Sequence, residues 1–255
     1  MKNHNRLKKV RLDKLLVEKG ICRTRERARA FIMAGTVIVG NRRIDKAGTL
    51  VPENADIRLK GEDHPYVGRG GLKLKGALDE FSIDVSGLVI LDVGASTGGF
   101  TDCLLQEGAK KVYALDVGYG QLAWKLRQDK RVVPIERTNI RTFEGAGIED
   151  PIDMAVIDVS FISLTLVISA VLKRVKECDA VILALIKPQF EAGREAVEKR
   201  GVVKDPNVHR KVVEDIKSFS SNLNLNVVGV CESPLTGPEG NKEFFIYLKT
   251  VGKGI

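Results

Sequence analysis

The sequence predicts an α/β protein with a seven-stranded, mostly parallel sheet whose last strand is antiparallel, preceded by a small α+β domain. Short apolar runs alternate with helical patterns through most of the chain, and a glycine-rich turn follows the first strong run. Nearly all of the excess positive charge lies in the first quarter. Alternating strands and helices indicate a parallel sheet covered on both faces. The concentrated charge indicates a separate N-terminal module.

The net charge of +8 is unevenly distributed over the 255 residues. Residues 1–60 hold 16 Lys and Arg against 6 Asp and Glu, a net charge of +10, and the other 25 basic and 27 acidic residues give −2. A basic segment joined to a near-neutral domain is typical of a module that binds a polyanion such as nucleic acid. The alternative interpretation is a solubilising surface.

The composition argues against membrane, secreted and zinc-stabilised proteins. No segment approaches the roughly 20 apolar residues that span a bilayer, and the basic residues 1–9 lead into no apolar signal core. The 4 cysteines lie far apart without a CxxC pair, and the chain has only 3 histidines. We therefore expect a cytoplasmic protein without a metal site or disulfide bonds.

Residues 1–60 contain the patterns of a small domain with two helices and short strands. Three leucines at helical spacing precede Gly20, a residue suited to end the first helix. Thr24 can cap the second helix, and Gly35 can end it. The helices are predicted at residues 11–20 and 25–35, and apolar strand segments at residues 36–44, with a turn at 40–41, and at residues 55–59.

Arginines are concentrated on this predicted domain. Arg25 and Arg29 are four residues apart and project together from the second helix, while the turn presents Arg42 and Arg43. Guanidinium groups so placed can contact phosphates and recognise RNA by its shape. The alternative is an ordinary solvated helix face. The predicted RNA-binding residues are Arg11, Arg23, Arg25, Arg29, Arg42 and Arg43, together with Arg69 of the following domain.

A polar linker at residues 61–67 is predicted to join residues 1–60 to a larger domain, residues 68–255. The last two strands of that domain have no helix between them, so they should form an antiparallel hairpin. Six parallel strands and one reversed strand are the arrangement of Rossmann-like methyltransferases. Strands are predicted at residues 88–93, 111–116, 132–135, 154–158, 180–186, 225–231 and 243–248, and helices around 99–107, 120–128, 163–177 and 207–221.

The first of these strands runs into a glycine-rich turn, residues 92–99 (DVGASTGG). Glycines let the backbone approach a ligand closely at the carboxyl edge of the sheet. A dinucleotide-binding loop has the spacing G-x-G-x-x-G, but Ser96 stands at its second glycine position. The pattern D-x-G-x-x-x-G-G instead favours S-adenosylmethionine. A nicotinamide cofactor and a loop without a ligand remain the alternatives.

In the methyl-donor interpretation, Asp92 meets the charged methionine end of the cofactor, directly or through water. Asp116 closes the second strand, where it can accept hydrogen bonds from both ribose hydroxyls. The predicted cofactor-binding residues are Asp92, Gly94, Ala95, Ser96, Thr97, Gly98, Asp116, Asn139 and Asp158.

Two lysines and two acids are expected beside this turn and are the candidate catalytic residues. Asp158 ends the fourth strand and Lys187 follows the fifth, so both should lie at the carboxyl edge. Glu243 begins the reversed last strand, whose start lies at the same edge. Lys73, in a helix before the first strand, can cover the site from the side. The alternative is a set of surface ion pairs.

The motifs resemble those of a known RNA-binding domain and of two methyltransferase families, one a branch of the other. The pattern RLDKLL…G…TRERARAFIMAGTVIVGNRRI resembles the S4 RNA-binding domain. The order Lys, Asp, Lys, Glu resembles the FtsJ-like ribose 2′-O-methyltransferases. Over almost the whole chain, the sequence is similar to the TlyA (hemolysin A) family of ribosomal RNA cytidine 2′-O-methyltransferases; the segments are YVGRGGLKLKGAL, LDVGASTGGFTDCLLQEGAKKVYALDVGYGQLAWKLR, ERTNIR, IDVSFISL, IKPQFE and GPEGNKEFFIYL. One local departure is Gly68, where serine is expected before Arg69.

The resemblance implies methyl transfer from S-adenosylmethionine to the 2′-hydroxyl of a cytidine in 16S or 23S ribosomal RNA, with ribosomal subunits as partners. A ribose hydroxyl is a poor nucleophile, so a base must take its proton. A lysine can do so only where burial or a second cation disfavours its charged form. We expect Lys187 to be the base, oriented by Asp158. Lys73 would steady the oxyanion and Glu243 would hold Lys73 and the ribose, although the lysines could exchange roles.

Some residues have weaker signals. Asn139 and Arg141 either flank the adenine or belong to an ordinary loop, and Trp124 and Phe100 are expected in the core. Residues 158–161 (DVSF) lack the Asp/Asn-Pro-Pro-aromatic pattern of enzymes that methylate amino groups of bases, which favours oxygen as the acceptor.

Three other functions are alternatives. A non-catalytic RNA-binding or ribosome-assembly protein could keep the same fold. A hemolysin-like membrane activity conflicts with the lack of a membrane-inserting segment. A pseudouridine synthase could also carry an S4 domain, but base isomerisation needs no methyl donor.

Overall fold

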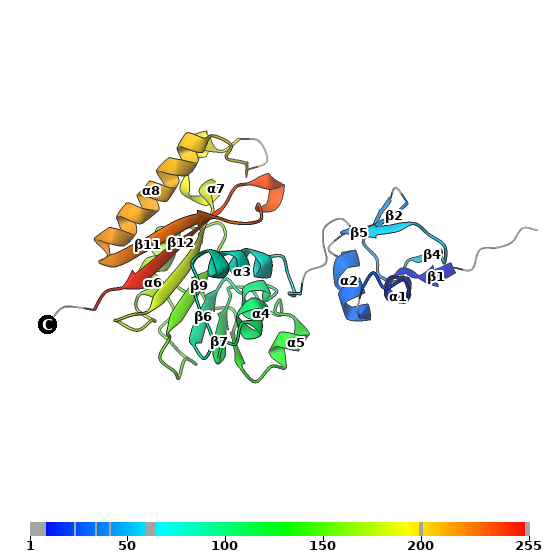
Figure 1. Cartoon of the computed structure of the whole chain (residues 1–255), viewed down its shortest axis with the longest axis horizontal. Coiled ribbons are helices and arrows are strands. Elements are labelled where there is room, and N and C mark those ends of the chain that lie inside the picture. Colours follow the sequence, from blue (N-terminus) through cyan, green and yellow to red (C-terminus); the bar gives the residue numbers. More distant parts are fainter. Residues whose placement is uncertain are drawn as a thin grey trace, which may run out of the picture. The chain divides into compact units, whose positions relative to one another are not determined.

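The structure, a computed structural model, describes residues 9–22, 24–33, 35–40, 42–59, 65–198 and 201–252. The chain separates into two compact units, Met1–Pro65 and Tyr66–Ile255 (Figure 1). The second unit begins at Tyr66 because its ring packs against Gly71, where an added Cβ would lie 2.3 Å from the ring. In addition, the backbone N–H of Val67 donates to Asp102.

The first unit packs two helices on short strands around a small core. Leu12, Leu15 and Leu16 from the first helix are buried against Ala28 and Ile32 from the second. The helices are α1 (Leu12–Glu18) and α2 (Arg25–Met33). Three antiparallel strands in the order β3-β2-β5 are β3 (Arg42–Ile44), β2 (Val37–Val39) and β5 (Ile57–Leu59), and β1 (Lys9–Arg11) pairs with β4 (Leu50–Pro52).

The residues predicted to begin and end the helices of the first unit are largely confirmed in that role. The side chain of Thr24 accepts a hydrogen bond from the backbone N–H of Arg27 at 3.2 Å, so the predicted cap is confirmed. Gly20 and Gly35 both have positive φ just beyond the helices. The β1–β4 pair was not predicted, because three-residue strands are too short to show an alternating pattern.

The second unit is built on a seven-stranded sheet in the order β11-β12-β10-β9-β6-β7-β8. Strand β12 pairs antiparallel with both neighbours, which confirms the predicted fold and terminal hairpin. The strands are β6 (Val89–Val93), β7 (Lys111–Leu115), β8 (Val132–Ile135), β9 (Met154–Ile157), β10 (Val181–Ile186), β11 (Leu225–Glu232) and β12 (Phe244–Thr250).

Helices cover both faces of this sheet (Figure 1). Leu91 belongs to a core with Val167 and Val212, whereas its neighbour Ile90 belongs to a core with Leu74 and Leu104, because successive residues of a strand face opposite sides. The helices are α3 (Gly70–Glu80), α4 (Gly99–Gln106), α5 (Trp124–Arg127), α6 (Leu164–Val171), α7 (Pro188–Glu191) and α8 (Pro206–Asn222).

Two helices are shorter than the sequence predicts. Helix α5 has one turn instead of the nine predicted residues, and α6 ends at Val171 instead of residue 177. After α6 the chain turns and Val175 forms a parallel bridge with Ile152. The apolar pattern continues through this turn because Val175 still packs in the core.

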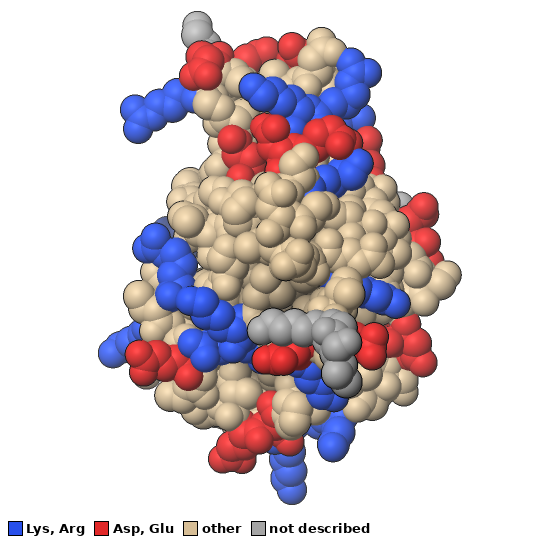
Figure 2. Space-filling view, turned by 90° about the vertical axis from the view of Figure 1, so that its left-hand side faces the viewer, with Lys and Arg blue, Asp and Glu red and all other residues tan. Residues whose placement is uncertain are grey.

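Surface charge on the second unit is mixed. Figure 2 shows basic and acidic side chains interspersed around a broad uncharged area on one face of the molecule. This pattern agrees with the net charge of −2 beyond residue 60. Among the described residues, no helix is both long enough and apolar enough to cross a membrane.

Candidate active site

Three aspartates lie at the carboxyl ends of neighbouring parallel strands. Asp92 is the second-last residue of β6, Asp116 follows β7, and Asp158 follows β9. The three strands are paired in register, with Asp92 opposite Ala114 and Val156. Their carboxylates therefore gather at one edge of the sheet and make it acidic, which suits a cationic ligand.

The turn after β6 has a backbone that only glycine adopts easily. Gly94 and Gly98 have φ values of 88° and 95°, and Ser96 between them has a φ of 49°. A Cβ on Gly94 would lie 2.3 Å from the main-chain oxygen of Asp158. The turn is therefore held tightly against the end of β9, and its glycines keep a backbone surface that side chains would otherwise fill.

Asp116 links this turn to the end of β7 through hydrogen bonds. One carboxylate oxygen accepts the backbone N–H of Ser96 at 2.7 Å, and the other accepts that of Gly118 at 2.7 Å. Each carboxylate oxygen can accept more than one hydrogen bond, so Asp116 can still accept donors from a bound sugar.

Asp92 is fully buried. Its Oδ2 accepts a hydrogen bond from the hydroxyl of Thr101 at 2.6 Å, while its Oδ1 is buried without a hydrogen-bond partner. Burial raises the pKa of Asp92 to about 7, and the nearby carboxylates of Asp158 and Asp116 act in the same direction. A cation bound near this edge would favour its ionised form.

The candidate catalytic residues form two ion pairs. Lys73 Nζ lies 2.6 Å from Glu243 Oε2, and both side chains are buried. Gly237 lies against the other oxygen of Glu243, because an added Cβ would be 2.1 Å from Oε1. Lys187 Nζ lies 2.6 Å from Asp158 Oδ1 and donates to the hydroxyl of Ser160 at 3.0 Å.

Strand register brings the two pairs to neighbouring positions. Ile186 of β10 lies opposite Phe244 of β12, so Lys187 and Glu243 are the next residues beyond that pair. Strand β9, which delivers Asp158, lies on the other side of β10. Asp158, Lys187 and Glu243 therefore stand at the ends of three adjacent strands, and Lys73 is contributed by α3.

Helix α3 reaches this edge through close contacts between glycines. An added Cβ on Gly99 would lie 3.1 Å from the backbone nitrogen of Gly71, so α3 and α4 approach closely at their N-terminal ends. At Gly68, where serine was expected, a Cβ would lie 3.2 Å from the hydroxyl of Thr97. Glycine thus relieves a tight contact with the glycine-rich turn. Arg69 is exposed at the start of α3.

One exposed aromatic residue beside the site was not predicted from the sequence. Phe161 is 90% exposed, has a φ of 64°, and its ring centroid lies 5.0 Å from that of Phe190. It follows Asp158 by three residues, and Phe190 follows Lys187 by three. Because left-handed backbone is costly for a phenylalanine, this exposed position suggests a functional constraint. Phe161 was missed because an apolar residue among other apolar residues is expected to be buried, and nothing in the sequence indicates that it is exposed.

Other predicted residues have mixed outcomes. Phe100 is buried as expected, but Trp124 is 72% exposed, so its prediction as a core residue was wrong. Trp124 is exposed because α5 is only one turn long and buries Leu126 instead. Asn139 uses its side-chain oxygen to accept the backbone N–H of Arg141 at 3.1 Å, which is a loop contact.

The predicted RNA-binding arginines of the first unit divide into two groups. Arg11, Arg25 and Arg29 contact the buried carboxylate of Asp13. Arg42 and Arg43 are exposed on β3. Arg23 lies outside the described residues.

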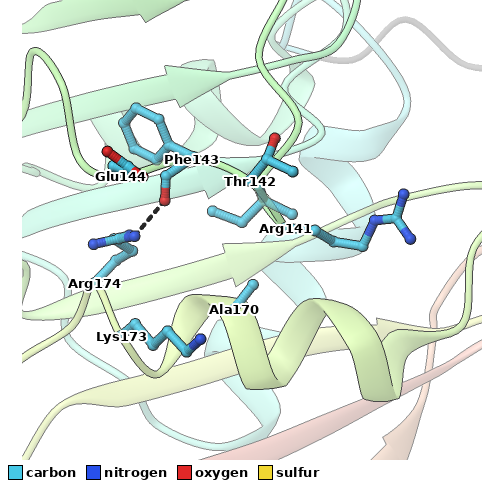
Figure 3. A pocket seen from close by; sticks show the side chains of 8 residues that line it. Arg141, Thr142, Phe143, Glu144, Ala170, Lys173 and Arg174 are labelled. Carbon is cyan, nitrogen blue, oxygen red and sulfur yellow. Dashed lines mark hydrogen bonds between the residues drawn. The ribbon is translucent and has the colours of Figure 1, made fainter.

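A shallow pocket of about 220 Å³ lies between residues 140–144 and the end of α6 (Figure 3). Arg174 donates to the main-chain oxygen of Phe143, and its guanidinium lies 5.8 Å from the centroid of that ring. Because the nearby Val175 pairs with Ile152, which precedes β9, this pocket lies towards the amino ends of the strands. It is therefore separate from the candidate active site. In the described part of the chain, no group of His, Cys, Asp or Glu could hold a metal ion.

The fold and the site together define an S-adenosylmethionine-dependent methyltransferase: a glycine-rich turn after the first sheet strand, an acid after the second, and a reversed last strand. The model of the FtsJ-like methyltransferase family matches residues 66–250, and that of the S4 domain matches residues 10–57. A solved structure from Streptococcus thermophilus, classed with the hemolysins, has a TM-score of 0.74 and 44% sequence identity, covering 96% of this chain and 90% of that chain.

Sequence relatives narrow the class to one family. The Bacillus subtilis protein YqxC, assigned as an rRNA methyltransferase, is 50% identical over 248 residues, 97% of this chain and 88% of the relative. The 16S/23S rRNA (cytidine-2′-O)-methyltransferase TlyA of Mycobacterium tuberculosis is 43% identical over 244 residues, 95% of this chain and 91% of the relative. The chain belongs to the TlyA (hemolysin A) family of FtsJ-like methyltransferases with an S4 domain, as its sequence motifs predicted.

Proposed function

We propose that this methyltransferase transfers a methyl group from S-adenosylmethionine to the 2′-hydroxyl of a cytidine in 16S or 23S ribosomal RNA. The observation that carries the proposal is the presence of two ion pairs, Lys73–Glu243 and Lys187–Asp158, at the sheet edge that holds the glycine-rich turn. The names of the relatives support the nucleotide and the RNA class. The S4 domain supports RNA as the partner.

We assign the cofactor to the turn from Gly94 to Gly98 and to the three aspartates around it. The glycines of the turn leave its backbone open to a ligand, and Asp116 would accept hydrogen bonds from the ribose hydroxyls of the cofactor. The carboxylates of Asp92 and Asp158 favour a positively charged donor. When bound, S-adenosylmethionine supplies an electrophilic methyl carbon.

In the proposed mechanism, Lys187 loses a proton before the reaction, and the resulting amine takes the proton of the 2′-hydroxyl as the oxygen attacks. Asp158, 2.6 Å from Lys187 Nζ, then stabilises the ammonium ion that forms. The ammonium group of Lys73, fixed by buried Glu243, stabilises negative charge on the attacking oxygen. Each lysine thus has its own carboxylate, which keeps the two roles separate.

We also propose that Phe161 stacks on the target base. Its ring is exposed beside the lysine that serves as base, and Phe190 supports it at 5.0 Å. Aromatic side chains commonly hold splayed-out RNA bases in this way. Such a contact would place the ribose of that nucleotide next to Lys187.

The function is tested by incubating the purified chain with bacterial ribosomal subunits and labelled S-adenosylmethionine, followed by mass spectrometry of the RNA nucleosides. We expect the label on the 2′-oxygen of a cytidine. A chain that binds the cofactor but transfers no methyl group would instead be a non-catalytic RNA-binding protein. Label on a base nitrogen would contradict the assigned chemistry of the two ion pairs.

A further inference from the structure

In the first unit, one buried carboxylate binds three arginines. Asp13 is fully buried in the first turn of α1. Arg11 donates to both of its oxygens at 3.0 Å, through Nε and Nη2. Arg25 donates to Oδ2 at 2.9 Å and Arg29 donates to it at 3.3 Å. The three arginines come from the residue that caps α1 and from two positions on α2.

The backbone fixes Asp13 where the arginines can reach it. Its N–H donates to the main-chain oxygen of Ala47 at 3.2 Å, and the N–H of Leu12 donates to that of Thr49 at 2.9 Å. The side chain of Leu12 is buried in the core of the unit. The backbone of Asp13 is therefore held by the fold itself, independently of the arginines.

Each of the three arginines is bound to Asp13 and remains partly exposed to solvent. Their side chains are 47%, 52% and 51% exposed for Arg11, Arg25 and Arg29, while Asp13 has no exposed surface. A guanidinium group has five N–H donors in a rigid fork, and Asp13 takes two from Arg11 and one each from Arg25 and Arg29. Half of each side chain thus remains available to a partner in solution.

Asp13 also reduces the electrostatic repulsion between the three arginines and their conformational freedom. Three guanidinium groups close together repel one another, and free arginine side chains have high conformational entropy. A shared carboxylate offsets the repulsion and restricts the orientations, leaving a net charge of +2 across the four side chains. The hydrogen bonds from Arg11, aided by those from Arg25 and Arg29 against the effect of burial, hold the pKa of Asp13 well below its usual range. The carboxylate thus remains charged at all physiological pH values.

We infer that Asp13 is a positioning residue for RNA binding, which sets the guanidinium groups of Arg11, Arg25 and Arg29 in one arrangement that matches successive phosphates of structured RNA. Prealigned forks lose less entropy when they bind phosphates than free side chains do. This inference rests on the proposed RNA substrate. It goes further in making an acidic residue necessary for binding a polyanion.

The test compares two substitutions that remove the same charge from the same helix. Asp13→Asn removes the shared carboxylate, and Glu18→Gln, the control, removes an exposed carboxylate paired with Lys14 at 3.3 Å. If only net charge mattered, both variants would bind RNA at least as tightly as the wild type. We expect Glu18→Gln to behave in this way and Asp13→Asn to bind about tenfold more weakly, with a shallower salt dependence.

Binding is measured with the full chain and a 23S ribosomal RNA transcript, by titration at several salt concentrations. Amide hydrogen exchange in α1 and α2 shows whether the Asp13→Asn module is folded. A second variant, Arg25→Lys with Arg29→Lys, keeps every charge and leaves Arg11 on Asp13, so the module is retained. It should also bind more weakly than the wild type, because lysine lacks the fork.

Asp13→Asn binding as tightly as Glu18→Gln would overturn the inference, and so would unchanged binding by the double lysine variant. Weak binding by both test variants, with the control unaffected, supports it. A wild-type chain without affinity for ribosomal RNA would overturn both the inference and the proposed function. If wild-type binding is normal and the variants match it, only the inference fails.

Discussion

At the scale of single residues, the candidate site depends on which carboxylate contacts which lysine. Lys187 and Asp158 come from neighbouring parallel strands, whereas Lys73 and Glu243 are 170 residues apart in the chain. The first pair is partly exposed to solvent and the second is buried. A proton that leaves a substrate can therefore reach bulk solvent more easily from Lys187, which is consistent with its proposed role as the base.

We predict that Lys187→Ala lowers the rate of methyl transfer by about 10³-fold, within the usual range for loss of a general base. Binding of S-adenosylmethionine should change little, because the turn from Gly94 to Gly98 is untouched. Transfer is measured with labelled cofactor on ribosomal subunits and binding by calorimetry. Lys204→Ala, which removes an exposed lysine paired with Glu198, is the control. Loss of cofactor binding in Lys187→Ala would contradict the assigned role.

The raised pKa of Asp92 predicts that the free energy of unfolding depends on pH. Its pKa is raised from 3.8 to about 7 in the folded chain, with Asp158 and Asp116 as the charged neighbours. Between these values the folded state holds a proton that the unfolded state has lost, so this residue makes stability fall as pH rises from about 4 to 7. The slope is at most about 1.4 kcal/mol per pH unit.

Denaturant unfolding of the wild type and of Asp92→Asn, measured at several pH values from 4 to 8, tests this effect. The difference between the two free energies of unfolding should change with pH in the stated direction and level off above pH 7. Parallel curves for the two proteins would show that Asp92 does not titrate in this range.

Residue environments were the hardest feature to predict. Phe100 and Trp124 are both aromatic residues in the first turn of a helix, yet the first is buried and the second is 72% exposed. Phe161 is in an apolar segment, and its exposure accompanies a positive φ at that residue. Exposure depends on where neighbouring elements end, and no single residue encodes that information.

At the scale of elements, the glycine-rich turn places two separate constraints on Gly94, one on its backbone conformation and one on the space beside it. Gly94 has a positive φ and also has no room for a Cβ, whereas Gly87 has a φ of 74° with open space around it. Gly87→Ala therefore measures the conformational cost alone, and Gly94→Ala measures that cost together with a steric clash.

We expect Gly87→Ala to lower the free energy of unfolding by about 1 kcal/mol. Gly94→Ala should lower it by about 2 kcal/mol more, because its Cβ would lie 2.3 Å from the main-chain oxygen of Asp158. It should also weaken cofactor binding, which Gly87→Ala should leave unchanged. Denaturant unfolding and calorimetry provide the measurements. Equal losses of stability in the two variants would indicate that the turn relaxes freely.

Strands of the second unit were predicted within one or two residues, because each is a short, largely apolar run. The helices were predicted less well. The pattern that suggested a helix to residue 177 includes Val175, which is buried in a turn beyond α6. Hydrophobic periodicity reports burial, and a buried turn can extend it beyond the end of a helix.

At the scale of the whole molecule, charge and chemistry are divided between the two units. Residues 1–60 carry a net charge of +10 and the rest carries −2. The candidate catalytic residues all belong to the second unit, which has its own core on both faces of the sheet. RNA affinity and cofactor affinity should therefore be separable.

Removing residues 1–60 should weaken binding to ribosomal RNA and reduce its salt dependence, because the salt slope falls by about 0.7 to 0.9 for each phosphate that the protein no longer neutralises. Affinity for S-adenosylmethionine should stay the same. Both affinities are measured on the full chain and the truncated chain, the first over a range of salt concentrations. An unchanged salt slope would count against the role of the first unit in binding RNA.

The sequence by itself determined the order of elements in the second unit, the reversed last strand and the glycine-rich turn, and it named the four candidate catalytic residues. These features follow from local periodicity and from the rule that parallel strands deliver their carboxyl ends to one edge. Only the tertiary structure decided that Asp92 is sealed from solvent, that Asp13 binds three arginines, and that Phe161 is exposed. Burial and pairing depend on distances between residues far apart in the chain, and those distances arise only when the elements pack together.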